Sequence, residues 1–173
     1  VTYPCSFILV CAMNPCKCGY YGHASKPCTC TPKARLAYTT KISGPLLDRI
    51  DIHVEVPALD YGELSRTEPA EPSAEIRRRV IAAREYAAER TDGAVTCNGL
   101  MTPSDIRRFC RMDESGGKLM QTAYDKFALS ARAYDRILKV ARTAADFDKS
   151  EIIRKEHIGL ALQLRSMNKK YWQ

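Results

Sequence analysis

The sequence predicts a short α/β layer followed by an all-α helical bundle. Two segments near the N-terminal end support the layer. Residues 6–12 form a continuous apolar run that stops just before Pro15, and residues 50–56 alternate apolar and polar side chains up to Pro57. Both patterns are typical of β-strands. From about Ser73 the pattern is helical throughout, so the second part is expected to be a bundle.

The composition is that of a folded protein and excludes several classes. The chain has 173 residues, 45% of them hydrophobic and 27% charged, which fits one domain or two small ones. No run approaches the roughly 18 apolar residues of a membrane span, and no secretory signal precedes the chain's first apolar run. We therefore expect a cytoplasmic protein with no membrane partner.

The net charge and the first residues add two expectations. A formal charge of +7 and a pI of about 9.0 favour polyanionic partners such as nucleic acid or nucleotide. The chain starts at Val1 without an initiator methionine and enters an apolar run at once, so we expect a fragment of a longer protein.

Capping residues predict where the helices begin. Pro45 lies near the first turn of a short helix expected over residues 44–49. Ser73 is expected to cap a helix that reaches about Arg90, and Thr102 with Asp105 resembles a capping box. Further helices are expected to begin at Asp113, Ser130 and Ser150.

One face of the helix from Ser130 is apolar and should pack inside the bundle. This face comprises Ile137, Val140, Ala141, Ala144 and Ala145. The predicted domains are residues 1–64, which include a cysteine-rich insertion at 16–30, a linker at 65–72, and a helical domain at 73–173.

Four cysteines form a candidate metal site. Cys16 and Cys18 make one C-x-C pair, Cys28 and Cys30 make another, and nine residues separate the pairs. Four thiolates can surround one ion, and zinc accepts four sulfur ligands without redox chemistry, so a structural zinc site is expected. Two disulfides, free thiols or an iron-sulfur cluster are alternatives, and His23 is an alternative ligand.

The other four cysteines are expected to be small buried hydrophobic residues. They are Cys5, Cys11, Cys97 and Cys110.

Residues 7–22 and 43–54 together closely resemble the Mg-chelatase-like AAA+ proteins of the ComM/YifB type, a competence-related helicase family. Residues 129–146 are similar to the C-terminal lid of that family. The resemblance covers nearly the whole chain and implies an α/β remnant of an AAA+ core followed by a helical lid. The family often has proline between the first two cysteines, where this chain has Lys17.

The resemblance also implies three ATP-site residues. Asn14 matches sensor 1, whose amide holds the attacking water, and Arg49 matches an arginine finger that acts on the nucleotide of a neighbouring subunit. Arg132 matches sensor 2. Each has a simpler interpretation: Asn14 can make a turn, Arg49 can pair with Asp48 or Asp51, and Arg132 can be a surface charge.

The phosphate-binding loop G-x-x-x-x-G-K-[ST] is absent from this sequence. Gly117-Lys118 is the only Gly-Lys pair, and the required earlier glycine position holds Met112. The fragment alone is therefore expected not to hydrolyse ATP, whereas the intact parent is expected to bind ATP and Mg²⁺.

Three functions are consistent with these features. The first is an ATP-driven DNA helicase or branch-migration motor that works as a ring of identical subunits, a hexamer, in recombination or natural transformation. The second is a magnesium-chelatase-type chaperone ATPase, and the third is a stand-alone zinc-containing nucleic-acid-binding module. Two arginine groups are candidates for phosphate contact or simply solvated faces: Arg77, Arg78, Arg79 and Arg84, and Arg107, Arg108 and Arg111.

Overall fold

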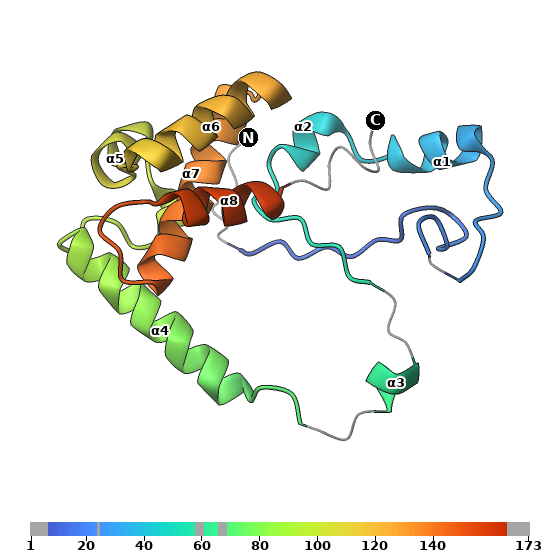
Figure 1. The fold of residues 1–173 in the computed structure, drawn as a ribbon, viewed down its shortest axis with the longest axis horizontal. Helices are drawn as coiled ribbons and strands as arrows, with labels where there is room; N and C mark the ends of the chain where they lie inside the picture. The colour runs from blue at the N-terminus through green and yellow to red at the C-terminus, as the bar shows by residue number, and fades with distance from the viewer. Residues whose placement is uncertain (1–6, 24, 58–60, 66–68, 166–173) are drawn as a thin grey trace. The chain divides into compact units, whose positions relative to one another are not determined.

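The computed structural model describes residues 7–23, 25–57, 61–65 and 69–165. Its internal contacts divide the chain into two compact units (Figure 1). We call the first, Val1–Ser43, the cysteine module, and the second, from Gly44 onward, the helical unit. The domains expected from the sequence, 1–64, 65–72 and 73–173, stay a prediction.

The cysteine module contains one helix, α1 (Pro32–Thr39). It begins where the sequence favours a helix start: the Thr31 hydroxyl accepts the Ala34 N–H at 3.2 Å, and Pro32 fills the first turn. Only Cys16 and Thr39 are buried among the described residues of the module. The module therefore has almost no hydrophobic core.

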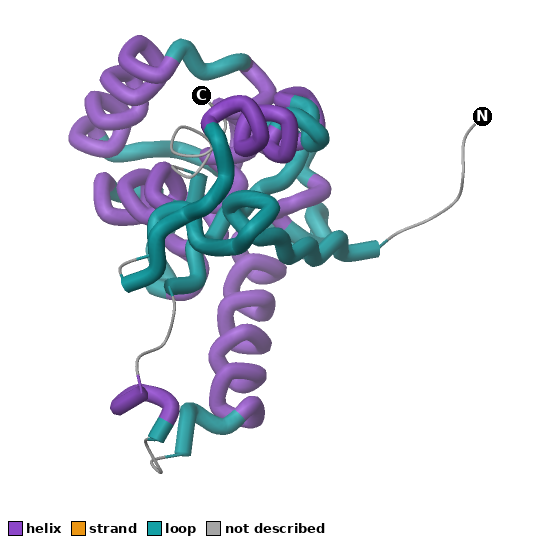
Figure 2. The backbone as a smooth tube through the Cα atoms, turned by 90° about the vertical axis from the view of Figure 1, so that its right-hand side faces the viewer, coloured by secondary structure: helices purple, strands orange, loops and turns teal. Residues whose placement is uncertain are grey.

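Both strand predictions are wrong for the residues that the structure describes. Figure 2 shows helix and loop over these residues and no strand. In the first segment Ile8 is 91% exposed and Val10 is 87% exposed, and in the second Val56 is 84% exposed. A strand exists only through pairing with a neighbour. Within the described ranges the one β-type pairing is an isolated parallel bridge between Met112 and Ile153, which involves neither segment.

The helical unit is built from one short 3-10 turn and seven α-helices over its described residues (Figure 1). The elements are α2 (Gly44–Leu47), α3 (Tyr61–Leu64), α4 (Ser73–Arg90), η1 (Asn98–Leu100), α5 (Pro103–Phe109), α6 (Glu114–Phe127), α7 (Ala131–Phe147) and α8 (Lys155–Gln163). The central helix is α7, which contacts α4, η1, α5 and α8, while α8 also contacts α6. The predicted helical bundle is confirmed.

The apolar face of α7 forms the middle of the bundle core. Ile137, Ala141 and Ala145 are buried, and Val140 and Ala144 are partly buried at its edge. Residues from the other helices and from the segments that join them close the core: Met101, Ile106, Cys110, Met120, Ile153, Ile158 and Ala161. This face was predicted from its helical spacing alone.

Most predicted helix starts are confirmed. Thr102 and Asp105 form a capping box at α5. The side chain of Asp113 caps α6, and that of Ser130 caps α7. The short helix expected at 44–49 is α2.

Two predicted starts are wrong. Ser73 is the first residue of α4 rather than its cap, because Pro72 occupies the N-cap position. Ser150 starts no helix, because its hydroxyl donates to the Ile152 carbonyl at 2.7 Å and α8 begins only at Lys155. At that start the His157 Nδ1 accepts the Arg154 N–H at 3.0 Å.

No helix in the described part of the chain is long and apolar enough to span a membrane.

Candidate metal centre and nucleotide-site residues

The four predicted cysteine ligands lie together in the cysteine module. Their sulfur atoms all fall within 4.8 Å of one another. Cys16 Sγ lies 3.3 Å from Cys18 Sγ and 3.7 Å from Cys28 Sγ, and Cys18 Sγ lies 3.5 Å from Cys28 Sγ. Cys16 is fully buried, and Cys18, Cys28 and Cys30 are partly buried. The two C-x-C pairs thus converge as the spacing predicts.

Tight turns and a helix hold the two pairs in place. After Cys16 the chain reverses through a turn in which the Gly19 N–H donates to the Cys16 carbonyl at 3.0 Å, and Gly19 has a φ of 84°. That backbone conformation favours glycine. On the other side, the Arg35 guanidinium of α1 donates to the Cys30 carbonyl at 2.8 Å. The helix therefore anchors the second pair.

This arrangement fits a tetrahedral metal and does not fit disulfides. A metal with four sulfur ligands at about 2.3 Å places those sulfurs about 3.8 Å apart. The separations of 3.3 to 3.7 Å among the sulfurs of Cys16, Cys18 and Cys28 are close to that value and far longer than the roughly 2.05 Å of an S–S bond, and the Cys30 sulfur lies within 4.8 Å of all three. The four thiols can therefore bind one metal ion.

The thiols differ in acidity. The backbone N–H of Tyr20 hydrogen-bonds to Cys18 and, with contacts from Cys16, Thr29 and Cys28, lowers the pKa of Cys18 to about 5 despite partial burial. A backbone hydrogen bond from Cys18 lowers the pKa of Cys30, but the Cys18 thiol and burial oppose it and raise that pKa to about 11. Cys18 is thus a ready thiolate ligand, and a cation must displace the proton from Cys30.

The remaining sulfur and imidazole predictions have mixed outcomes. Cys110 is buried as predicted, and burial raises its pKa to about 11. Cys11 and Cys97 are exposed, so their predicted burial is wrong, and Cys5 lies outside the described residues. His23 is not part of the sulfur group, because its Nδ1 accepts the N–H groups of Ser25 and Lys26, each at 3.2 Å.

Asn14, the candidate sensor 1, is exposed in the cysteine module just before the cysteine turn. Its amide lies beside Gly19, where an added Cβ would stand 3.9 Å from the Asn14 side chain. The amide thus keeps both donor and acceptor groups open to solvent.

Arg49, the candidate arginine finger, is exposed directly after α2 in the helical unit. Its guanidinium donates to the Pro45 carbonyl at 2.6 Å, a contact within the same turn. No ion pair joins Arg49 to Asp48 or to Asp51 among the described residues, and the Asp51 carboxylate accepts from Arg136. The Asp51 and Ile50 carbonyls accept from Arg165 at 3.3 and 2.7 Å.

Arg132, the candidate sensor 2, is exposed in the first turn of α7. Ser130 caps this helix by accepting the Ala133 N–H at 3.1 Å, which fixes the direction in which the helix starts. Asn14 thus belongs to the cysteine module, whereas Arg49 follows α2 and Arg132 lies in α7 of the helical unit, and their grouping around one nucleotide stays a prediction.

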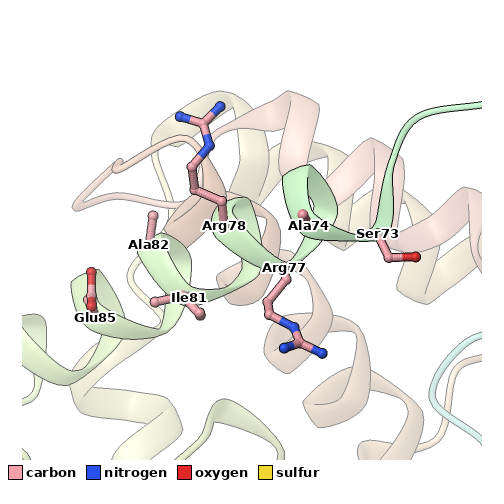
Figure 3. Close-up of a pocket in the computed structure, with 7 residues that line it drawn as sticks. All are labelled: Ser73, Ala74, Arg77, Arg78, Ile81, Ala82 and Glu85. Atoms are coloured by element: carbon pink, nitrogen blue, oxygen red, sulfur yellow. The ribbon is translucent and has the colours of Figure 1, made fainter.

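Two of the arginines in the arginine-rich part of α4 pair with acidic neighbours. Arg78 pairs with Glu75 at 2.7 Å, and Arg79 pairs with Glu71 at 2.6 Å. Figure 3 shows Arg77 and Arg78 leaving opposite sides of the helix, so they do not share one surface. A shallow hollow of about 610 Å³ along this part of α4 is lined mainly by Ala74, Ile81 and the stems of these arginines.

Sequence reasoning missed a buried charge network in the helical unit. The Asp146 carboxylate accepts from Arg90 at 3.0 and 3.2 Å, from Arg142 at 3.0 Å and from Asn98 at 2.6 Å. Arg142 is fully buried, and burial lowers its pKa. It also donates to the carbonyls of Ser150 and Glu151. An Arg-Asp pair four residues apart beside the apolar face of α7 was the available signal.

Comparison with known families covers both parts of the chain. Residues 1–64 match the model described as magnesium chelatase, subunit ChlI, and residues 70–165 match the model described as magnesium chelatase, subunit ChlI C-terminal.

Individual relatives agree. The chain is 39% identical over 171 residues to the uncharacterized protein YifB of Escherichia coli, which is 98% of this chain and 33% of that protein. It is 37% identical over 168 residues to the competence protein ComM of Haemophilus influenzae, covering 96% of this chain and 32% of ComM. The chain thus spans about one third of the length of these relatives.

Proposed function

The chain belongs to the Mg-chelatase-like family that includes ComM and YifB, and from this membership we propose that it forms the C-terminal part of an ATP-driven AAA+ motor. The motor is a ring of identical subunits, a hexamer, that moves DNA during recombination or natural transformation. The similarity to a competence protein supports this choice over a chelatase-type chaperone role.

The observation that carries the proposal is the placement of Arg49. Its guanidinium is exposed just after a short helix, and among the described residues its hydrogen-bond partner is a carbonyl one turn back. Because it is not committed to an ion pair with Asp51, it is available to a phosphate on a neighbouring subunit. Such an arginine stabilises charge on the leaving phosphoryl group.

Asn14 and Arg132 complete the contribution of this chain. Asn14 orients the attacking water through its amide, and Arg132 contacts the nucleotide from the start of α7. The loop that cradles the phosphates and places Mg²⁺ is not in this sequence, so the chain alone is inactive.

Zinc is the metal that we assign to the cysteine group, in a structural role. Four thiolates form a closed tetrahedral set that leaves no position for a reacting water. Cys16, Cys18, Cys28 and Cys30 hold the ion and thereby fix the loop that follows Asn14.

Replacing Arg49 in the full-length ring tests the proposal. We expect Arg49→Ala to lower ATP turnover by about 10³-fold, because the missing charge acts on the transition state. Nucleotide binding, measured by fluorescence titration, should change little. Rings that mix this variant with subunits defective in the phosphate-binding loop should regain turnover, since each supplies what the other lacks.

Lys118→Ala is the matched control, because Lys118 is an exposed basic residue on α6 that pairs with Glu114 and lies outside the proposed ATP site. It should leave turnover unchanged. Equal loss of binding and turnover in Arg49→Ala contradicts the finger role. ATP turnover that is indifferent to DNA contradicts the DNA motor and favours the chelatase-type alternative.

A further inference from the structure

The acidic residues are unevenly distributed along the chain. All 20 Asp and Glu residues lie after residue 47, so residues 1–43 carry basic side chains and no carboxylate. The basic side chains are Lys17, Lys26, Lys33, Arg35 and Lys41. Four thiolates on a divalent metal add a net charge of about −2, so the cysteine module remains positive. A positive surface without internal ion pairs attracts a polyanion.

The four lysines of this set are all exposed. Arg35 differs, because its guanidinium is already bound to the Cys30 carbonyl and anchors α1. The lysines therefore supply exposed positive charge, while Arg35 has a structural role through its hydrogen bond to the Cys30 carbonyl. Point charges on flexible stems suit the phosphates of a nucleic acid backbone.

Two adjacent tyrosines stand in the same loop as the cysteines. Tyr20 is 38% exposed and Tyr21 is 37% exposed. Lys26 Nζ lies 5.2 Å from the centre of the Tyr20 ring, and the Arg35 guanidinium lies 4.6 Å from the centre of the Tyr21 ring. The Tyr20 ring also meets His23 edge-on at 5.8 Å. Each ring is thus partly exposed and has a cation over one of its two faces.

Exposed rings beside cations are the two components of single-strand recognition. Unstacked bases stack on aromatic rings, while neighbouring cations contact the backbone. A duplex hides its base faces and would use only the charges. The acid-free surface and the tyrosine pair therefore favour a single strand over a duplex.

The metal group adds rigidity to this surface. Tyr20 and Tyr21 directly follow the Cys16–Gly19 turn, and the Tyr20 N–H is bound to Cys18. The backbone that carries both rings is therefore held close to the sulfur group, which limits the entropy lost when a base stacks.

We propose that the cysteine module is a single-stranded DNA contact surface, in which Tyr20 and Tyr21 stack on bases and Lys17, Lys26, Lys33 and Lys41 contact phosphates. The inference rests on the proposed function only in naming DNA as the polyanion. It assigns to the metal-centred loop a binding role that the ATP-site residues do not require.

A matched pair of charge variants tests the surface. The probe is a fluorescein-labelled oligothymidylate, and binding to the zinc-loaded chain of residues 1–173 is measured by anisotropy over a range of salt, with no nucleotide present. We expect Lys17→Gln with Lys26→Gln to weaken binding and to reduce the log-log salt slope by about 1.4, since each single-strand phosphate contact contributes about 0.7.

Arg78→Gln with Arg79→Gln removes the same total charge from α4, where both arginines are paired with glutamates. This control should leave affinity and slope nearly unchanged. If the arginine pair weakens binding as much as the lysine pair, the surface is not in the cysteine module and the proposal is overturned.

The tyrosines are tested separately with Tyr20→Leu and Tyr21→Leu, which keep an apolar side chain but remove the stacking ring. Each should weaken oligothymidylate binding by about 5- to 100-fold, and neither should affect binding to a duplex of equal length. Unchanged single-strand affinity in both overturns the stacking role. An oligouridylate bound more than tenfold tighter than the oligothymidylate overturns the assignment to DNA.

Two measurements separate this inference from the proposed function. Metal content and thermal unfolding of each variant must match the parent chain, which shows that the surface itself was changed. Full-length turnover that ignores DNA, together with single-strand binding by residues 1–173, refutes the motor and keeps the surface. DNA-dependent turnover that survives all the lysine and tyrosine replacements refutes the surface and keeps the motor.

Discussion

The cysteine module and the helical bundle are held together in different ways. In the described part of the module only Cys16 and Thr39 are buried, and its order depends on the sulfur group and on α1. The bundle buries a continuous apolar core around α7 and adds an internal charge network at Asp146. We therefore expect the cysteine module to depend on a bound ion, whereas the bundle depends on packing.

This difference indicates which substitutions each region can tolerate. Most described residues of the module outside the sulfur group are exposed, so their side chains are available for binding. In the bundle, Arg90, Arg142 and Asn98 all depend on one carboxylate, so a single change at Asp146 affects three partners. We therefore expect substitutions in the module to change mainly binding, and substitutions in the bundle core to change mainly the free energy of unfolding.

Removing the metal should have the largest effect, and only on the module. Structural zinc supplies about 10–16 kcal/mol of binding free energy in small zinc-finger peptides, far more than the module's few buried side chains can supply. We expect Cys16→Ser with Cys28→Ser to lose about one zinc per chain by metal analysis and to lose amide-exchange protection in the module.

The bundle's thermal unfolding should be unaffected by that double change. Cys11→Ser with Cys97→Ser is the control, because both cysteines are exposed and lie outside the sulfur group. It should keep the metal. If the metal-free chain kept full amide-exchange protection in the module, the claim that the module depends on a bound ion would be refuted.

Asp146→Ala should have the next largest effect, in the bundle. The change leaves the guanidinium groups of Arg90 and Arg142 buried without their carboxylate, which costs about 3–5 kcal/mol. Urea unfolding followed by circular dichroism measures the loss. The exposed Asp125 of α6 is the control, and Asp125→Ala should change stability by no more than about 0.5 kcal/mol. Equal losses in the two variants would show that the charge network at Asp146 contributes nothing to the free energy of unfolding.

Ser130→Ala should have the smallest effect. It removes the side chain that caps α7 and should cost about 1 kcal/mol in the same urea experiment. The control is Thr122→Ala. Thr122 is exposed in the middle of α6, where alanine is a good helix former, so this change should not lower the free energy of unfolding. A loss in Thr122→Ala as large as that in Ser130→Ala would refute the capping explanation.

The parts of the structure that depend on local sequence were predictable. Thr102, Asp113 and Ser130 cap helices because the cap and the N–H that it binds are three residues apart. The sulfur group was predictable because two C-x-C pairs with glycines between them can close on one ion. The apolar face of α7 followed from helical spacing.

The parts that depend on distant partners were not predictable. Arg90 and Asp146 are 56 residues apart, so no local pattern joins them. Residues 7–12 and 50–56 have strand-like sequences, but a strand needs a neighbour, and the described chain offers neither segment one. The positions of Asn14, Arg49 and Arg132 around a nucleotide remain a prediction.

The two ends of helix α4 differ in what stabilises them. Its last residue, Arg90, is tied to Asp146, whereas residues 73–81 are exposed on every side. A free helix shorter than about 12–15 residues is marginal in water, so the nine exposed residues could not hold this form by themselves. Their helicity therefore depends on propagation from the packed C-terminal end, so we expect a change that loosens that end to shorten α4 from its N-terminus.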